Sequence, residues 1–277
     1  MARILDTASD FDTFARKAFL ESPVLREQLW RERYEGSHPE VFEAFYAEHA
    51  ATDGRAALVR ELSKVRQRVG EAAPVVRKLI EELDPAVGRA LGLPASPSPL
   101  HVLMVGPYST NAAVGRLGED VALFHCLEWF NSAEGARVVV AHEGCHAWHE
   151  IALGQAPPED DVAWTTFSEG LAIQASRALV PDRDEYDYFW YGHAGFEEWL
   201  PWCQEHRDDL WQRLRDSLDD PAAGETFFGS GLVEGRWRVG YFVADVLVAG
   251  LGRSLPELAA MSVAEGREAV RSALTAP

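Results

Sequence analysis

Two histidines spaced four residues apart are the residues of this chain best suited to chemistry. His142 and His146 form the pattern His-Glu-x-x-His with Glu143. Residues four apart lie one above the other on a helix, so both imidazoles would point to one place and could bind one zinc ion. Glu143 lies beside them, where its carboxylate could accept a proton from a metal-bound water. Two histidines leave a zinc site incomplete, so a third protein ligand is required.

This short pattern can also arise by chance, with the histidines serving as capping or surface residues. The four residues before it, Val138 to Ala141, are all apolar and predict a buried helix. A buried helix has no structural reason to carry two histidines and a glutamate in its middle. The context therefore favours a metal site.

His149 is the nearest further histidine, three residues after His146. On a helix it would lie roughly 10 Å from His142 along the axis, too far to share an ion with it. We interpret His149 as a structural histidine, or as one that supports a ligand from behind. The metzincin pattern would need glycine at position 149 and histidine at position 152, so His149 and Ala152 exclude that class.

Glu169 is the better candidate for the third ligand. It belongs to the next predicted helix. If the two helices form an antiparallel pair joined by the loop 154–161, the Glu169 carboxylate would return to the two histidines. Gly170 beside it would allow two helices to approach closely. The alternative is that Glu169 is simply favoured near a helix N-terminus by the helix dipole. The residues alone leave both interpretations open.

Several segments together resemble the gluzincin metallopeptidases, and most closely the group described as predicted zinc-dependent proteases. The resemblance covers roughly residues 101–270 and is carried by Asn111-Ala112-Ala113, the strand 120–124, His142-Glu143-Gly144-Cys145-His146, Ser168-Glu169-Gly170-Leu171-Ala172 and Val239-Gly240-Tyr241. It implies a zinc ion held by His142, His146 and Glu169, with Glu143 as general base and acid. It also implies that the strand 120–124 is the edge on which an extended peptide substrate pairs.

The implied mechanism is hydrolysis of a peptide bond by water. Three protein ligands leave one zinc position for water, whose pKa falls toward ~7, and Glu143 takes the proton and passes it to the leaving nitrogen. The resemblance suggests Tyr241 as donor to the oxyanion, with Tyr191 and His193 as competitors. Tyr241 could equally be a core aromatic, because it falls on a helical stripe with Trp237, Ala244 and Val248.

Other polar residues receive less specific interpretations. Asp245 is expected to mark a solvated helix edge. Arg236 and Arg238 could anchor a substrate carboxylate, although arginines at a helix start are usually solvated. Cys145 is expected to be a small buried thiol. His125 and Cys126 would point to opposite faces of a strand.

Composition limits the classes of partner. The chain has 277 residues, 47% of them hydrophobic, and a formal net charge of −18, which argues against nucleic acid or an anionic membrane as partner. Three cysteines without C-x-x-C spacing argue against a disulfide framework. No apolar run approaches a membrane span, and no secretion signal is evident. We expect a cytoplasmic enzyme with a peptide or protein substrate. The alternatives are a zincin scaffold with a binding or regulatory role and a metal enzyme that acts on a small molecule. The oligomeric state is not determined by the sequence.

The predicted fold is mainly α with a small β-sheet, an α+β zincin-like arrangement with the active-site helix beside a mixed sheet. The Pro-rich segment 93–99 divides it into a helical N-terminal subdomain, 1–98, and a metallopeptidase domain, 99–277. Strands are expected at 101–105 and 120–125, with a loop at 106–118 between them. Helices are expected at 55–69, 74–91, 164–179, 202–218 and 237–251, the second being one helix or two, and Ser22, Ser37, Ser254 and Ser262 are expected to cap others.

Overall fold

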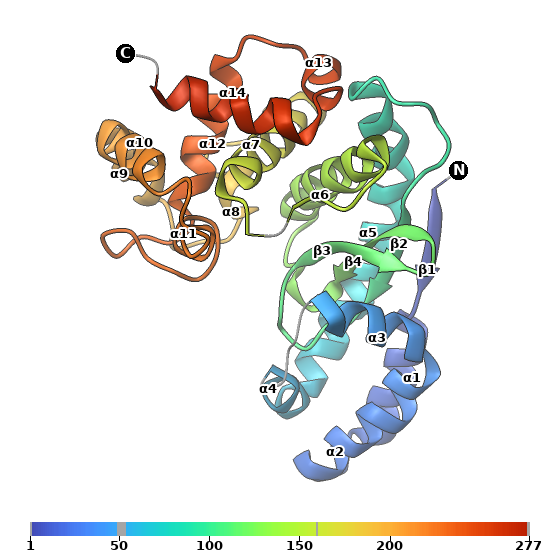
Figure 1. Ribbon diagram of the computed structural model, residues 1–277. Helices are drawn as coiled ribbons and strands as arrows, with labels where there is room; N and C mark the ends of the chain where they lie inside the picture. Colours follow the sequence, from blue (N-terminus) through green and yellow to red (C-terminus); the bar gives the residue numbers. More distant parts are fainter. Residues whose placement is uncertain (1, 49–53, 159, 276–277) are drawn as a thin grey trace. The chain divides into compact units, whose positions relative to one another are not determined.

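Helices dominate the chain, and one small mixed sheet accompanies them (Figure 1). The computed structural model describes residues 2–48, 54–158 and 160–275. The prediction of a mainly helical protein with a small sheet is confirmed. No helix in these described ranges is both long enough and apolar enough to cross a membrane.

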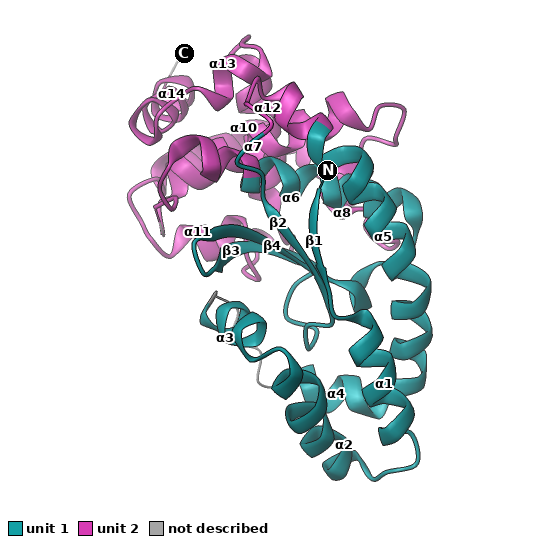
Figure 2. Cartoon of the chain, turned by 90° about the vertical axis from the view of Figure 1, so that its right-hand side faces the viewer, with its two compact units in different colours: residues 1–85, 96–147 teal, residues 86–95, 148–277 magenta. Residues whose placement is uncertain are grey.

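The chain forms two compact units, shown in different colours in Figure 2. Unit 1 comprises residues 1–85 and 96–147, and unit 2 comprises residues 86–95 and 148–277. Two long helices contribute to both units: α5 (Leu62–Ala90) and α6 (Ala133–Leu153). The division into domains 1–98 and 99–277 stays a prediction.

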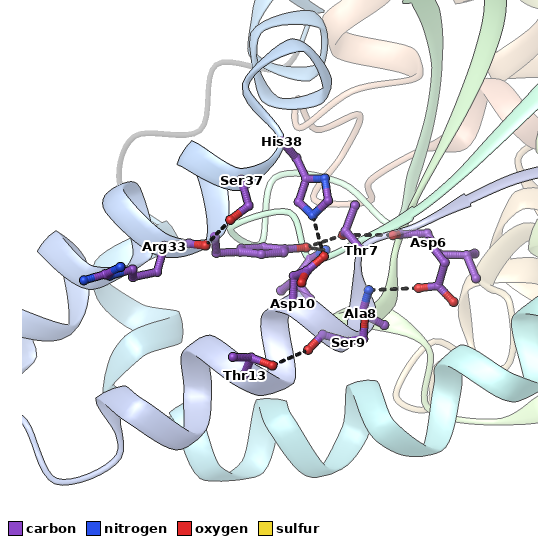
Figure 3. Close-up of polar contacts among 12 residues, drawn as sticks. Asp6, Thr7, Ala8, Ser9, Asp10, Thr13, Arg33, Ser37 and His38 are labelled. Atoms are coloured by element: carbon purple, nitrogen blue, oxygen red, sulfur yellow. Dashed lines mark hydrogen bonds and ion pairs between the residues drawn. The ribbon is translucent and has the colours of Figure 1, made fainter.

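Unit 1 begins with a strand and a group of short helices. These are β1 (Arg3–Asp6), α1 (Ala8–Ala18), α2 (Pro23–Leu29), α3 (Pro39–Glu48) and α4 (Gly54–Arg60). The predicted cap of α2 is confirmed, since the Ser22 hydroxyl accepts the Leu25 N–H. Ser37 donates instead to the Arg33 carbonyl, one turn back (Figure 3). The predicted helix 55–69 is interrupted at Glu61, where the chain turns between α4 and α5.

Side chains join the first strand to the helices that follow it (Figure 3). The Asp6 carboxylate accepts the Ala8 N–H at 2.8 Å, which fixes the entry into α1. Asp10 on α1 pairs with His38 at 2.8 Å, just before α3 begins. Thr7 shares a buried hydrogen bond of 2.7 Å with Tyr34. These contacts attach the N-terminal helices to the sheet.

The sheet has the strand order β1-β2-β4-β3. Its other strands are β2 (Leu100–Met104), β3 (Ala112–Leu117) and β4 (Asp120–Cys126). β1, β2 and β4 run parallel, and β3 pairs antiparallel with β4. The strands at 101–105 and 120–125 are confirmed. The prediction that 120–124 forms the edge is wrong, because β4 lies between β2 and β3; the edges are β1 and β3, which the sequence pattern did not reveal.

The two faces of the sheet are covered by different helices. Register places Val102 beside Phe124 on one face, where Phe124 packs against Phe45 of α3. The opposite face carries His101, whose imidazole lies 3.2 Å from Asp84 of α5. The sequence left 74–91 as one helix or two, with Asp84 as a possible cap. The structure forms one helix, and Asp84 is buried against the sheet.

Unit 2 is a helical assembly. Its helices are α7 (Val162–Leu179), α8 (Asp187–Trp190), α9 (Trp199–Glu205), α10 (Arg207–Asp216), α11 (Ala223–Phe227), α12 (Val239–Gly250), α13 (Leu255–Ala259) and α14 (Val263–Thr275). The capping boxes at Ser254 and Ser262 are confirmed. The single helix predicted for 202–218 is wrong: it is divided at His206 into α9 and α10. The His206 ring stacks on Trp202 and contacts the Trp202 carbonyl at 2.9 Å.

Helices α7 and α12 pack closely in unit 2. A Cβ added to Gly170 would overlap the backbone of Ala244 and a methyl group of Val248, so only glycine permits this separation. The sequence predicted that Gly170 would allow close approach between the two helices of the proposed antiparallel pair. The close approach that Gly170 allows in the structure is between α7 and α12. Asp245 of α12 accepts hydrogen bonds from Gln174 and Arg177 of α7. This pairing fixes the position of Glu169 relative to the start of α12.

Candidate metal centre

The helix α6 presents two imidazoles to one point, as its spacing predicts. His142 Nε2 and His146 Nε2 lie 3.2 Å apart, and the two rings meet edge to face. Neighbouring ligands of a tetrahedral zinc ion with Zn–N bonds of about 2.0–2.1 Å are about 3.3 Å apart. The two nitrogens therefore have the separation that one shared ion requires. Residues 138–142 are buried, which confirms the expected burial of this helix.

Glu169 supplies a carboxylate to the same group. One ligand atom from each of His142, His146 and Glu169 lies within 4.8 Å of the others, and no other such group occurs among the described residues. His142 is buried, whereas His146, Glu169 and Glu143 are partly exposed. Two imidazoles and one carboxylate are a donor set that zinc accepts, and partial exposure leaves access for water.

The position of Glu169 on α7 weakens the dipole explanation for this residue. Asp161 caps α7 by accepting the Trp164 N–H at 2.9 Å. Glu169 lies beyond the first turn, where the field of the helix end has largely decayed. The dipole thus gives no reason for a glutamate at this position.

His149 lies in an aromatic environment in unit 2. It is 2% exposed, and its ring packs against those of Trp164 and Phe167, with centroids 5.4 and 6.2 Å away. It is not part of the metal-compatible group. This environment agrees with its interpretation as a structural histidine.

Tyr241 and its two competitors gather around one arginine in unit 2. The Arg238 guanidinium lies over the Tyr241 ring at 4.1 Å and over the Tyr191 ring at 5.5 Å. Burial and the nearby Arg238 charge lower the pKa of His193. The core stripe proposed for Tyr241 is interrupted: Trp237 precedes the helix and is 48% exposed, and Tyr241 is only partly buried. The Tyr241 ring thus contacts both a guanidinium and an apolar ring, that of Phe228 at 5.5 Å, at a partly exposed position.

No protein-family model, curated protein or solved structure matches this chain. The residues themselves must carry the functional argument.

The other polar residues singled out by the sequence have different environments. Asp245, expected at a solvated edge, is 8% exposed and pairs with Arg177 at 2.9 Å, so that prediction is wrong. An isolated acid in an apolar helix did not reveal its partner on another helix. Cys145 is buried, as expected. His125 stacks on His101, whereas Cys126 lies beside Gly106, as strand alternation predicted.

Two buried groups in unit 1 were not singled out by sequence. Glu128, in the turn between β4 and α6, is fully buried and accepts the N–H groups of Gly106 and Tyr108 at 3.2 and 3.1 Å. Burial raises the pKa of Glu128 to about 8. Through these two hydrogen bonds, Glu128 connects the loop after β2 to the turn that precedes α6. Asp84, His101 and His125 form a second buried chain, with His101 Nδ1 and His125 Nε2 3.1 Å apart.

Proposed function

We propose that this protein is a zinc-dependent hydrolase, a peptidase of the gluzincin type with a zincin-like fold. The observation that carries the proposal is the convergence of His142, His146 and Glu169 on one point, with the two histidine nitrogens 3.2 Å apart. A bound zinc ion would supply a water of lowered pKa and polarise the substrate carbonyl.

The protein's own residues would handle protons and orientation. Glu143 follows His142 directly on α6 and is partly exposed, so its carboxylate can take a proton from water and return it to the leaving nitrogen. Tyr241 is the proposed donor to the developing oxyanion. The Arg238 guanidinium lies 4.1 Å from the centroid of the phenol ring and helps to hold that ring in place.

An extended peptide substrate would add to an edge of the sheet. β3 is the edge strand next to β4, so Ala112–Leu117 replaces the strand 120–124 as the proposed docking strand. β3 has small residues at Ala112, Ala113 and Gly115, which allow another backbone to approach. A peptide or protein is accordingly the proposed partner.

Metal analysis and activity assays test the proposal together. The purified protein should contain close to one zinc per chain, and His146→Ala or Glu169→Ala should lose it. Added zinc at 100 times its Kd should stabilise the metal-free protein by about 2.7 kcal/mol. His149→Asn is the matched control and should retain zinc. A protein that binds no zinc under any of these conditions contradicts the proposal.

Hydrolysis is tested separately with a mixture of unstructured peptides. Glu143→Gln should abolish cleavage and retain the metal, because the glutamine keeps the size of the side chain and cannot accept the proton. Zinc bound without any cleavage by the unmutated protein would favour a binding or regulatory role for the scaffold over an enzyme.

A further inference from the structure

Arg238 lies against more aromatic rings than the other described arginines of unit 2 that contact one. Its guanidinium is surrounded by the rings of Trp190, Tyr191 and Tyr241, at 5.5, 5.5 and 4.1 Å from their centroids. The guanidinium makes one hydrogen bond within the described ranges, a long contact of 3.5 Å to the Tyr191 hydroxyl. Its Nε is buried without an acceptor, as is that of Arg236. Among the residues that the structure describes, no carboxylate forms an ion pair with Arg238.

Arg177 shows how the same fold satisfies an arginine that is only structural. It also lies over an aromatic ring, that of Tyr188, at 4.5 Å. Its guanidinium is nevertheless bound by two carboxylates, Asp245 at 2.9 Å and Glu185 at 2.7 Å. A chain with 44 acidic and 26 basic residues has many carboxylates available, yet none in the described ranges forms an ion pair with Arg238.

The backbone at this point is also unusual. Arg238 and Tyr191 both adopt left-handed conformations, with φ of 59° and 54°. Non-glycine residues in this region carry strain of about 1–3 kcal/mol, which tends to occur at functional sites. The side chains of Arg238 and Tyr191 contact each other, so both strained residues lie at the buried guanidinium.

The electrostatics of the cluster favour an incoming anion. Burial alone would lower the pKa of Arg238, but the phenols of Tyr241 and Tyr191 and the carboxylate of Glu169 reverse this, so the pKa rises and the group stays cationic. Zinc bound at Glu169 would take up that carboxylate's negative charge. The guanidinium would then be left with donors and no anion, and a planar carboxylate fits its paired N–H groups.

We propose that Arg238 is the specificity-determining residue of the site and binds a carboxylate of the substrate between the rings of Tyr191 and Tyr241. The proposal rests on the proposed function, because Glu169 is taken as a metal ligand. The substrate class is peptides with a free C-terminal carboxylate or an acidic side chain near the bond that is cleaved.

A binding test with a matched pair of probes does not require hydrolysis. Titration calorimetry with full-length Glu143→Gln protein uses 3-phenylpropionate and 3-phenylpropanamide, which differ only in the carboxylate. The acid should bind about tenfold or more tightly than the amide, as expected for a desolvated charge pair. Arg238→Met should remove this preference, and Arg238→Lys should keep part of it, because lysine retains the charge without the fork.

Arg236→Met is the control variant. Arg236 lies two residues earlier, over the ring of Trp202 at 5.6 Å. It should leave the acid-to-amide ratio unchanged. Equal binding of acid and amide, failure of the acid to bind, or a preference that survives Arg238→Met would each overturn the proposal.

Kinetics identify the source of the carboxylate. Peptides with a free C-terminus are compared with their C-terminal amides, and amidated peptides containing Glu are compared with those containing Gln. Arg238→Met should raise KM about tenfold for one carboxylate class, with a smaller change in kcat. If the unmutated protein cleaves no peptide, the proposed function fails while the calorimetric preference still decides the role of Arg238. A change in zinc affinity alone would overturn the proposal and assign Arg238 to the support of Glu169.

Discussion

Replacement of Gly170 by alanine tests the packing that positions Glu169. The added Cβ would overlap the Ala244 carbonyl oxygen and a Val248 methyl group and would lie 2.9 Å from the Ala244 carbonyl carbon. Carbon atoms pack best at about 3.5–4.0 Å, so the helices must separate by roughly 0.6 Å or more. The atoms that clash belong largely to the backbone, which cannot rotate away as a side chain could.

The expected cost follows from two opposing effects. Overpacking of a well-packed contact costs typically 1–3 kcal/mol, and the backbone clash at Gly170 favours the upper end. Alanine returns about 1 kcal/mol of helix propensity. The net loss in the free energy of unfolding is about 2 kcal/mol, or about 4–8 °C in Tm for a protein of this size.

Circular dichroism during urea and thermal unfolding measures this change, with Gly70→Ala as control. Gly70 lies inside α5 with nothing within 4 Å of an added Cβ. The control should gain roughly 0.5–1 kcal/mol from helix propensity. If Gly170→Ala were as stable as the unmutated protein while Gly70→Ala behaved as expected, the close packing of α7 on α12 would be refuted. Zinc affinity should also fall in Gly170→Ala, because Glu169 precedes the displaced residue.

Two further predictions concern buried acids. Asp245→Ala should lower the free energy of unfolding by about 3 kcal/mol in urea titrations, since it leaves Arg177 part-buried without this carboxylate; Asp245→Ala with Arg177→Met should recover part of the loss. The pKa of Glu128, about 8, lies above its ordinary value near 4.5, so the folded state retains a proton that the unfolded state releases. The stability that this group contributes is therefore fully present below pH 4.5 and is lost as the pH rises to about 8. The free energy of unfolding should fall more between pH 5 and 8 in the unmutated protein than in Glu128→Gln.

The outcomes that contradict these predictions are specific. A loss below about 0.5 kcal/mol in Asp245→Ala would mean that the pair with Arg177 is effectively solvated. Parallel stability curves for the unmutated protein and Glu128→Gln across pH 5–8 would mean that Glu128 ionises normally in the folded state.

Short-range features of this protein followed from the sequence. The spacing of His142 and His146, the cap at Ser22 and the boxes at Ser254 and Ser262 depend on residues within one or two turns. Strand β4 and the helix α6 were also predicted, because their apolar runs are long enough to indicate burial without knowledge of their partners. The sequence could propose Glu169 as a third ligand. Whether the helix dipole explains this glutamate instead could be judged only once the first residue of α7 was known.

Long-range pairing was decided only by the tertiary structure. β1 is a four-residue strand whose partner β2 lies far along the chain. β3 contains two alanines and a glycine, residue types that are depleted in strands. The edge of the sheet was therefore assigned to the wrong strand. Asp245 was judged solvated because its partner, Arg177, lies on another helix.

Arg238 is the clearest case of this limit. A start-of-helix arginine is solvated by default, and neither its left-handed backbone nor the rings around it has a local sequence signal. The sequence thus determined which residues could do chemistry and which segments carry them. The tertiary structure decided which charges are paired, because burial and partners depend on segments far apart in the chain.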